Sequence, residues 1–458
     1  MKVIIIGGGV SGLTAGLKLH ENGIDFEILE GDTEYGGRIK NIEWNGYKID
    51  IGAKWFEGLD GNPVWDKYSH LIKNKVKSDW DDCVMYDYTG KVCDINDFDF
   101  DSIDEFSIDR QKNKKDDITI KTALYMNNLI PTIENIHIFN CLEFNYYDSE
   151  YGNPNITSLY KTCPRNYNNT IKEGVYFTGG NYKNIVDEIA KEIKKKIKCD
   201  CKVIKISYDN NKCKVHTNDK IYECDYVICT VSLGVLKNKL IKFEPELPEW
   251  KLENFNTMEM SSFNIIFVKF DKCDYEWSKE TYLYADLRRG YYPYWINLTL
   301  DKYYGKKSNL FCIIVSGDEA IRLELILDKE IIKKEINTIA RLMLGEEINV
   351  ADVYIPKWNS NELYKGTFSN WPVDLSNKEF EIMKKPINNL YFAGEHTSEK
   401  YNGYVHGAYI SGIDVADKII NKIKYKPNYL IYLLIKLKQY LLLIILFLLI
   451  CFIGHLLV

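Results

Sequence analysis

The sequence has no C-x-x-C pair and no excess of positive charge. Its 12 cysteines are scattered and no signal peptide precedes the first apolar segment, so no disulfide framework is expected. The formal net charge of −6 gives no reason to expect a nucleic-acid partner and mildly favours a cationic ligand. No metal site is predicted. At 458 residues the chain is longer than one ordinary core, so two domains are expected.

Charge is absent altogether from residues 440–458, which contain no Asp, Glu, Lys or Arg. As a helix this run would cover about 28 Å, close to the hydrocarbon thickness of a bilayer. Lysines flank only its N-terminal side, at Lys424, Lys426, Lys436 and Lys438. We therefore expect a transmembrane tail anchor over 440–458, a juxtamembrane linker over 425–439, and the rest of the chain on the cytosolic side.

Glycine is concentrated at the N-terminus, where an apolar strand over 2–6 runs into Gly7-Gly8-Gly9-Val10-Ser11-Gly12. The pattern Gly7-x-Gly9-x-x-Gly12 is typical of a dinucleotide-binding turn, in which the helix N-terminus points its amides at a pyrophosphate. A second strand, 26–30, ends in Glu30, where a carboxylate binds the adenosine ribose. The sequence therefore predicts a bound nucleotide.

Apolar strands that lead into a turn recur in the middle and near the end of the chain. The apolar strand 226–230 leads into a turn at Ser232, and the strand 390–393 leads into Gly394. The fold class is predicted as α/β (α+β), with a Rossmann-like domain formed by 1–75, 196–240 and 376–424. A mixed-sheet domain formed by 76–195 and 241–375 is interleaved with it. Periodicity predicts a strand over 263–270 and helices over 185–197 and 329–344. The acid-rich stretch 94–109 predicts a solvated surface loop or lid, with attraction of a polycation as the alternative.

Several further motifs together resemble the flavin-containing amine oxidases, most closely the plant-type polyamine oxidases. Beside the first glycine turn they are Gly36-Gly37-Arg38, Gly52-Ala53-Lys54-Trp55-Phe56-Glu57-Gly58, Val231-Ser232-Leu233-Gly234, Arg288-Arg289-Gly290-Tyr291-Tyr292, Tyr364-Lys365-Gly366-Thr367-Phe368-Ser369-Asn370-Trp371-Pro372, Gly394-Glu395-His396-Thr397 and Tyr401-Asn402-Gly403-Tyr404-Val405-His406-Gly407. The resemblance covers nearly all of the chain before residue 424.

The resemblance implies FAD as the cofactor, bound without a covalent link, and no cysteine lies between Cys312 and Cys451 to tether it. By motif position, Arg38 lies beside the flavin and pyrophosphate, Val203 contacts the adenine through its backbone, and Glu395 binds the ribityl or pyrophosphate end. The full implied cofactor set is Gly7, Gly9, Ser11, Gly12, Glu30, Gly37, Arg38, Val203, Gly394, Glu395, Tyr404 and Val405.

The same resemblance implies oxidation of a polyamine at a C–N bond by hydride transfer to flavin N5, giving an aldehyde, a smaller amine and, with O₂ as acceptor, H₂O₂. Phe368 and Tyr404 would form aromatic walls, with Trp358 and Trp371 nearby. Glu57 would anchor a distal ammonium of the substrate, and Glu150 is a loosely aligned second acid. An aromatic, dry pocket favours the neutral, oxidisable amine.

One position departs from the family pattern. The family places a lysine that holds a water beside flavin N5 where this chain has Ile265, and Lys269 matches a different lysine. The departure predicts slow turnover of the flavin and leaves other readings open. These are a monoamine or protein-lysine amine oxidase, which Glu57 disfavours, and a catalytically weak, membrane-anchored flavoprotein scaffold.

Overall fold

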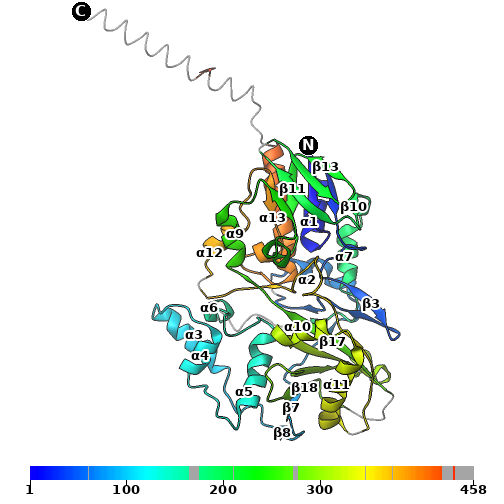
Figure 1. The fold of residues 1–458 in the computed structure, drawn as a ribbon, viewed down its shortest axis with the longest axis vertical. Coiled ribbons are helices and arrows are strands. Elements are labelled where there is room, and N and C mark those ends of the chain that lie inside the picture. The colour runs from blue at the N-terminus through cyan, green and yellow to red at the C-terminus, as the bar shows by residue number, and fades with distance from the viewer. Residues whose placement is uncertain are drawn as a thin grey trace, which may run out of the picture.

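The computed structural model of the chain describes residues 1–59, 61–163, 175–209, 211–271, 277–345, 347–373, 375–424 and 437–438. The apolar, β-branched N-terminal run forms β1, which is buried from Val3 onward. β1 lies in the middle of a five-stranded parallel sheet in the upper half of Figure 1. In sheet order the strands are β10 (Ile197–Lys198), β2 (Asp25–Leu29), β1 (Lys2–Ile6), β14 (Tyr226–Cys229) and β23 (Leu390–Phe392).

Successive side chains of β1 face two different layers, as the alternation of a strand requires. Val3 and Ile5 pack against helices, whereas Ile4 and Ile6 pack against a second sheet. The helical layer contains α1 (Val10–Glu21), α2 (Pro63–Tyr68), α7 (Lys183–Ala190) and α13 (Val405–Lys424). The opposite layer contains β13 (Ile221–Cys224), β12 (Cys213–Thr217), β11 (Val203–Tyr208) and β15 (Lys242–Glu244), with α8 (Leu233–Lys237), α9 (Glu249–Asn256) and α12 (Asn377–Met383).

The parallel sheet joins segments that lie far apart in the sequence. β14 pairs directly with β1, and β23 pairs with β14. The predicted α/β architecture with a Rossmann-like domain is therefore confirmed. Helix α7 packs into the same core as α1, although the sequence-based division assigned 76–195 to the other domain. The remaining domain limits stay a prediction.

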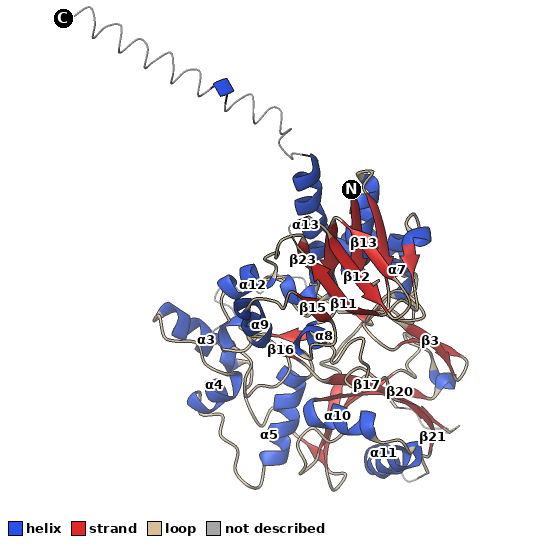
Figure 2. Cartoon of the chain, turned by 45° about the horizontal axis from the view of Figure 1, so that its top comes forward, coloured by secondary structure: helices blue, strands red, loops and turns tan. Residues whose placement is uncertain are grey.

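A second sheet of seven strands lies in the lower half of Figure 1. Its neighbouring strands are antiparallel except for the parallel pair β18–β7. In sheet order they are β21 (Val350–Tyr354), β17 (Phe263–Phe270), β20 (Leu310–Ser316), β19 (Tyr294–Asn297), β18 (Thr281–Ala285), β7 (Cys83–Asp87) and β8 (Val92–Cys93). α10 (Gly317–Leu325) and α11 (Lys329–Leu344) cover the face that carries Ile266, as Figure 2 shows beside β17 and β20.

The opposite face of this sheet packs against a second group of helices. They are α3 (Ser102–Lys112), α4 (Ile120–Met126), α5 (Ile136–Glu143) and α6 (Leu159–Thr162), and a π-helical turn (Phe144–Asp148) follows α5. The prediction of a solvated loop over 94–109 is wrong from Ser102 onward. Asp104 and Glu105 stand in the first turn of α3, where acids stabilise a helix, and Ile103 is buried in the core.

Three small strand pairings lie between the large sheets. β3 (Asn41–Trp44) and β4 (Tyr47–Asp50) form a hairpin, β9 (Tyr176–Phe177) lies between β5 (Trp55–Phe56) and β6 (Val76–Lys77), and β16 (Glu259–Met260) pairs with β22 (Ser369–Asn370). They matter for function because Glu57 directly follows β5 and Phe368 directly precedes β22.

The expected tail anchor over 440–458 lies outside the described residues, as does nearly all of the linker 425–439. Among the residues that the structure describes, no helix combines the length and the apolar character needed to cross a bilayer.

Candidate active site

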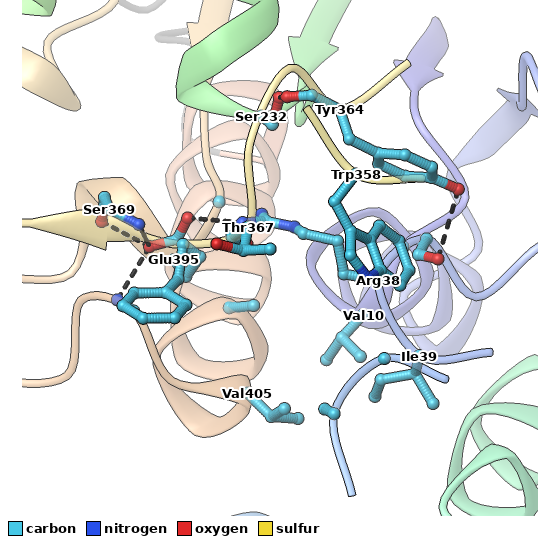
Figure 3. Close-up of a pocket in the computed structure, with 18 of the residues that line it drawn as sticks. Val10, Arg38, Ile39, Ser232, Trp358, Tyr364, Thr367, Ser369, Glu395 and Val405 are labelled. Atoms are coloured by element: carbon cyan, nitrogen blue, oxygen red, sulfur yellow. Dashed lines mark hydrogen bonds and ion pairs between the residues drawn. The ribbon is translucent and has the colours of Figure 1, made fainter. Parts of the chain in front are cut away.

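A single cavity runs from the glycine turn after β1 to the face of the seven-stranded sheet. It collects residues that the sequence spreads over almost 400 positions, and Figure 3 shows several of them converging from different elements. Of the predicted site residues, Gly12 does not line the cavity. Those that do are Gly7, Gly9, Ser11, Glu30, Gly37, Arg38, Glu57, Val203, Trp358, Phe368, Gly394, Glu395, Tyr404 and Val405.

Two of the three positions in the glycine turn require glycine, Gly12 because of close backbone packing and Gly7 because of its backbone conformation. A Cβ on Gly12 would lie 2.0 Å from the carbonyl oxygen of Gly7, and Gly7 itself has a φ of +101°. A Cβ on Gly9 would meet only the Cα of Gly37, at 3.9 Å, so the protein's own packing does not require glycine there. Helix α1 also begins without a side-chain cap. The space at Gly9 and the uncapped amides fit a pyrophosphate.

Glu30 lies buried at the end of β2, beside this turn. Its two carboxylate oxygens accept hydrogen bonds from the backbone N–H of Gly8 at 2.6 Å and of Asp32 at 2.8 Å. Burial raises the pKa of Glu30, and these backbone donors partly offset that effect. A carboxylate can accept about four hydrogen bonds. Glu30 therefore keeps acceptor capacity for the hydroxyls of a ribose.

Arg38, which is partly exposed, and the buried carboxylate of Glu395 form an ion pair between distant parts of the chain (Figure 3). One guanidinium nitrogen of Arg38 donates to Glu395 Oε1 at 2.8 Å and to the carbonyl oxygen of Thr367 at 2.7 Å. The second oxygen of Glu395 accepts from Ser369 Oγ and from the backbone N–H of Gly403. Burial acts to raise the pKa of Glu395, but Arg38 and its other partners lower it on balance. Thr367 and Ser369, which hold this pair, were not among the predicted site residues.

The N-terminus of α1 and the start of α13 are held together by two serines. Ser11 Oγ lies 3.1 Å from Ser411 Oγ, which also accepts the N–H of Gly394 at 3.0 Å. This bond places the Gly394-Glu395 turn and Val405 beside the glycine turn after β1. Ser411 was not predicted, because no local pattern marks a residue that bonds a partner 400 positions away.

Aromatic side chains form walls of the cavity. The ring of Phe368 lies 5.6 Å from that of Phe263, and Tyr404 stacks on His406 at 5.3 Å. Trp358 contacts Tyr364 edge-on at 5.2 Å. Its backbone N–H donates to buried Glu324 at 2.9 Å, a positioning contact that sequence reasoning missed. These walls are suited to exclude water and to hold an apolar or cationic chain.

Glu57 is positioned by Asn62, whose role the sequence analysis also missed. Asn62 Nδ2 donates to the backbone carbonyl of Glu57 at 3.2 Å and lies 3.2 Å from His406 Nδ1. Asn62 Oδ1 accepts the N–H groups of Val64 and Trp65, which makes Asn62 the N-cap of α2. The sequence signal for this cap was Asn directly before Pro63, the usual start of a helix.

Among the carboxyl groups that line the cavity, Glu57 and Glu150 lie close enough for their charges to interact. Glu57 lies deep in the protein while its side chain stays partly open to the cavity. Burial raises the pKa of Glu57, and the charge of Glu150 raises it further. A cationic ligand between them would relieve both effects, so this end of the cavity is suited to ammonium groups.

Ile265 lines the cavity from β17, opposite Ile314 of β20. The correspondence of Ile265 to the family lysine stays a prediction. Lys269, four residues on, donates to the carbonyl oxygen of Ser308 and does not line the cavity. β17 therefore offers an apolar side chain where the family pattern has an amine.

We expect Asn62→Ala to lower the free energy of unfolding by about 1–3 kcal/mol, because the variant loses a helix cap and leaves the partly buried carbonyl of Glu57 without this donor. Urea denaturation of the apoprotein measures the loss. Asn62→Ser is the control, since a serine restores the cap but not the bond to Glu57, and it should recover part of the loss. An unchanged midpoint for Asn62→Ala would show that neither contact matters.

We expect acid to destabilise the fold through His406. Burial lowers the pKa of His406 from 6.5 to about 4, so between these values the unfolded chain binds a proton that the folded chain does not. Stability therefore falls as the pH falls through this window. Relative to the wild type, His406→Gln should gain about 1.4 kcal/mol for each pH unit of acidification. Denaturation at several pH values measures this difference, and a difference that stays constant across the window would contradict the expectation.

Comparison with known proteins identifies the family. A model described as flavin containing amine oxidoreductase matches residues 141–420, and a model of the NAD(P)-binding Rossmann-like domain matches residues 5–71. Polyamine oxidase 6 of Oryza sativa subsp. japonica is 34% identical over 453 residues, covering 92% of this chain and 90% of that protein. Polyamine oxidase 1 of Zea mays is 33% identical over 455 residues, covering 92% of this chain and 90% of its own length.

A more distant relative has a name that indicates a different substrate. The Lysine-specific histone demethylase 1 homolog 1 of Arabidopsis thaliana is 26% identical over 452 residues, covering 91% of this chain and 52% of that protein. No cysteine lines the cavity within the described part of the chain, in agreement with a cofactor held without a covalent link. The chain belongs to the flavin-containing amine oxidoreductases and is an FAD-dependent oxidoreductase that acts on CH–NH groups.

Proposed function

We propose that this enzyme oxidises polyamines of the spermidine or spermine type, with O₂ as electron acceptor. The observation that carries the proposal is the pair of acids, Glu57 and Glu150, at one cavity with aromatic walls. A polyamine has several ammonium groups separated by apolar carbon chains, and this cavity offers carboxylates and aromatic rings. The 33–34% identity to two plant polyamine oxidases supports the same conclusion.

In this proposal the glycine turn and the N-terminus of α1 hold the pyrophosphate of FAD, and Glu30 holds the adenosine ribose. Val203 contacts the adenine. Arg38 and Glu395 lie at the flavin end of the site, bridged by their ion pair. Ser11, Gly37, Gly394 and Val405 complete this cradle. When bound, FAD supplies a hydride acceptor for the carbon beside the substrate nitrogen.

The residues of the chain do the remaining work by binding and orientation. Glu57 pairs with a distal ammonium and so sets which nitrogen reaches the flavin. Phe368, Tyr404 and Trp358 exclude water around the reacting carbon, which favours the neutral amine because a dry environment disfavours its charged form. Asn62 keeps Glu57 in place through its backbone carbonyl.

A series of amines with one, two, three and four amino groups and similar spacing tests the substrate class. We expect kcat/KM to rise with the number of ammonium groups, with H₂O₂ formed in step with the aldehyde. A monoamine that matches or exceeds spermidine in kcat/KM would contradict the proposal, and so would turnover without H₂O₂ in air.

We also propose that residues 440–458 attach the enzyme to a membrane, with the flavin domain on the cytosolic side. The proposal rests on the sequence alone, namely a run without charged residues and lysines only on its N-terminal side. Expression of the chain with and without 440–458, followed by membrane flotation, tests it. Flotation that persists without this segment would contradict it, as would protection of the flavin domain from protease in sealed microsomes.

A further inference from the structure

Lys54 is a fully buried lysine that lines the cavity directly before β5. Its ammonium nitrogen has no hydrogen-bond acceptor among the described residues. It lies instead over the ring of Phe267, 4.5 Å from the centroid. An ammonium has three donors, and burying one without acceptors is costly unless a ligand or solvent satisfies it. A buried ammonium in this position therefore indicates a functional role at the cavity.

The ammonium of Lys54 lies on the same face of β17 as Ile265. Ile265 and Phe267 are two residues apart on one strand, so their side chains share a face and their Cα atoms are about 7 Å apart. Ile265 and Lys54 both line the cavity. The chain thus carries an amine on this face after all, supplied by a different segment.

The backbone of Lys54 is held firmly. Its carbonyl oxygen accepts the N–H of Thr178 at 3.0 Å and the hydroxyl of Thr178 at 2.9 Å. The same hydroxyl also bonds buried Asp50, at 2.6 Å. These contacts fix where the side chain of Lys54 starts.

Two ionisable groups act on the amine from neighbouring strands. Burial lowers the pKa of Lys54 to about 8, while Cys312 of β20 and Asp50 of β4 act to raise it. Asp50 does not line the cavity. Its Oδ2 accepts from Thr178 and from the N–H of Tyr182, while Oδ1, like the Lys54 amine, has no hydrogen-bond partner among the described residues, so the two groups do not bond each other. Because Lys54 lines the cavity, a ligand or a water there can supply the acceptor.

We propose that Lys54 is a positioning residue that holds a water in the cavity for the bound flavin, in place of the lysine that the family pattern puts at Ile265. The proposal rests on the FAD-dependent amine oxidation proposed above. Under this proposal Ile265 does not mean that the enzyme lacks the amine, because Lys54 supplies it from another segment. The native enzyme then has no reason to turn over its flavin slowly.

The test uses the full-length holoenzyme and the variant Lys54→Met. Removing a buried, unpaired charge should leave the thermal stability equal or higher. We expect flavin reduction by spermidine or reoxidation by O₂ to slow by at least about tenfold in stopped-flow measurements. The reduction potential of bound FAD should also fall, because a nearby cation stabilises the added electrons. Lys269→Met is the matched control, since this lysine lies on the same face of β17 but outside the cavity, and its rates should stay within about twofold.

A lysine placed at Ile265 in the Lys54→Met background distinguishes a positioning role of Lys54 from a structural role. The double variant Lys54→Met/Ile265→Lys should regain the lost rate and the potential, which a merely structural lysine would not allow. Lys54→Met with wild-type rates and potential would overturn the proposal, and so would a folded, FAD-loaded double variant that regains neither. If no polyamine reduces the wild-type flavin, the proposed function fails, but the potential still reports whether Lys54 acts on the flavin.

Discussion

Replacing Arg38 with methionine is expected to lower the free energy of unfolding of the apoprotein by about 3–5 kcal/mol and to abolish stable FAD binding. Glu395 is only 3% exposed, and Arg38 is its ion-pair partner at 2.8 Å. Removing one partner of such a pair leaves a buried charge without compensation. That cost is a large part of the total stability of an ordinary domain, about 5–15 kcal/mol. Urea denaturation and the flavin content of the purified protein measure the two effects.

Arg322→Met is the control for this experiment. Arg322 pairs with Glu319 and Glu335 and does not line the cavity. The Arg322→Met variant should be less stable than the wild type but should still bind FAD. Arg38→Met with the stability of the wild type would show that Glu395 does not need its partner, and unchanged FAD affinity would exclude Arg38 from the cofactor site.

Replacing Glu57 with glutamine is expected to lower kcat/KM for spermidine by roughly ten- to hundredfold while leaving a monoamine of similar length nearly unaffected. A hydrogen-bonded charged pair that is partly buried contributes about 1.5–3 kcal/mol, and only a substrate with a distal ammonium can form it. Glutamine keeps the shape of the side chain, so the loss reports the charge. Steady-state kinetics with both amines measures the change in preference.

Glu362→Gln is the matched control for Glu57→Gln. Glu362 also lines the cavity, but it pairs with Lys202 and its side chain is 62% exposed. The preference for spermidine should therefore be unchanged. An equal loss on the two amines in Glu57→Gln would assign Glu57 a structural role and weaken the case for a multiply charged substrate.

Local signals in the sequence predicted the elements that carry the site. The strand over 263–270 and the helix over 329–344 were predicted with the bounds that β17 and α11 have. The glycine turn could be predicted because backbone contacts such as Gly12 to Gly7 require a particular residue type at a fixed spacing. The segment 94–109 was mispredicted because acids are typical of a solvated loop and also of the first turn of a helix.

Contacts between distant segments could not be predicted from the sequence pattern. Asn62 lies 344 positions from His406, and Ser11 lies 400 positions from Ser411, so no periodicity or spacing connects them. Lys54 is a further example, because the sequence does not show that its side chain packs on the face of β17 that carries Phe267. The departure at Ile265 could be read from the sequence, but the packing of Lys54, from the segment before β5, against the same face of β17 required the tertiary structure.

Anaerobic mixing of the purified full-length enzyme with spermidine tests the central claim most directly. Polyamine oxidation by FAD predicts complete bleaching of the visible flavin absorption, recovery of the colour when air is admitted, and release of the flavin into the supernatant on acid denaturation. A monoamine of similar length should bleach the flavin far more slowly. A flavin that keeps its colour with spermidine and spermine, in protein that is folded and carries FAD, would contradict the account.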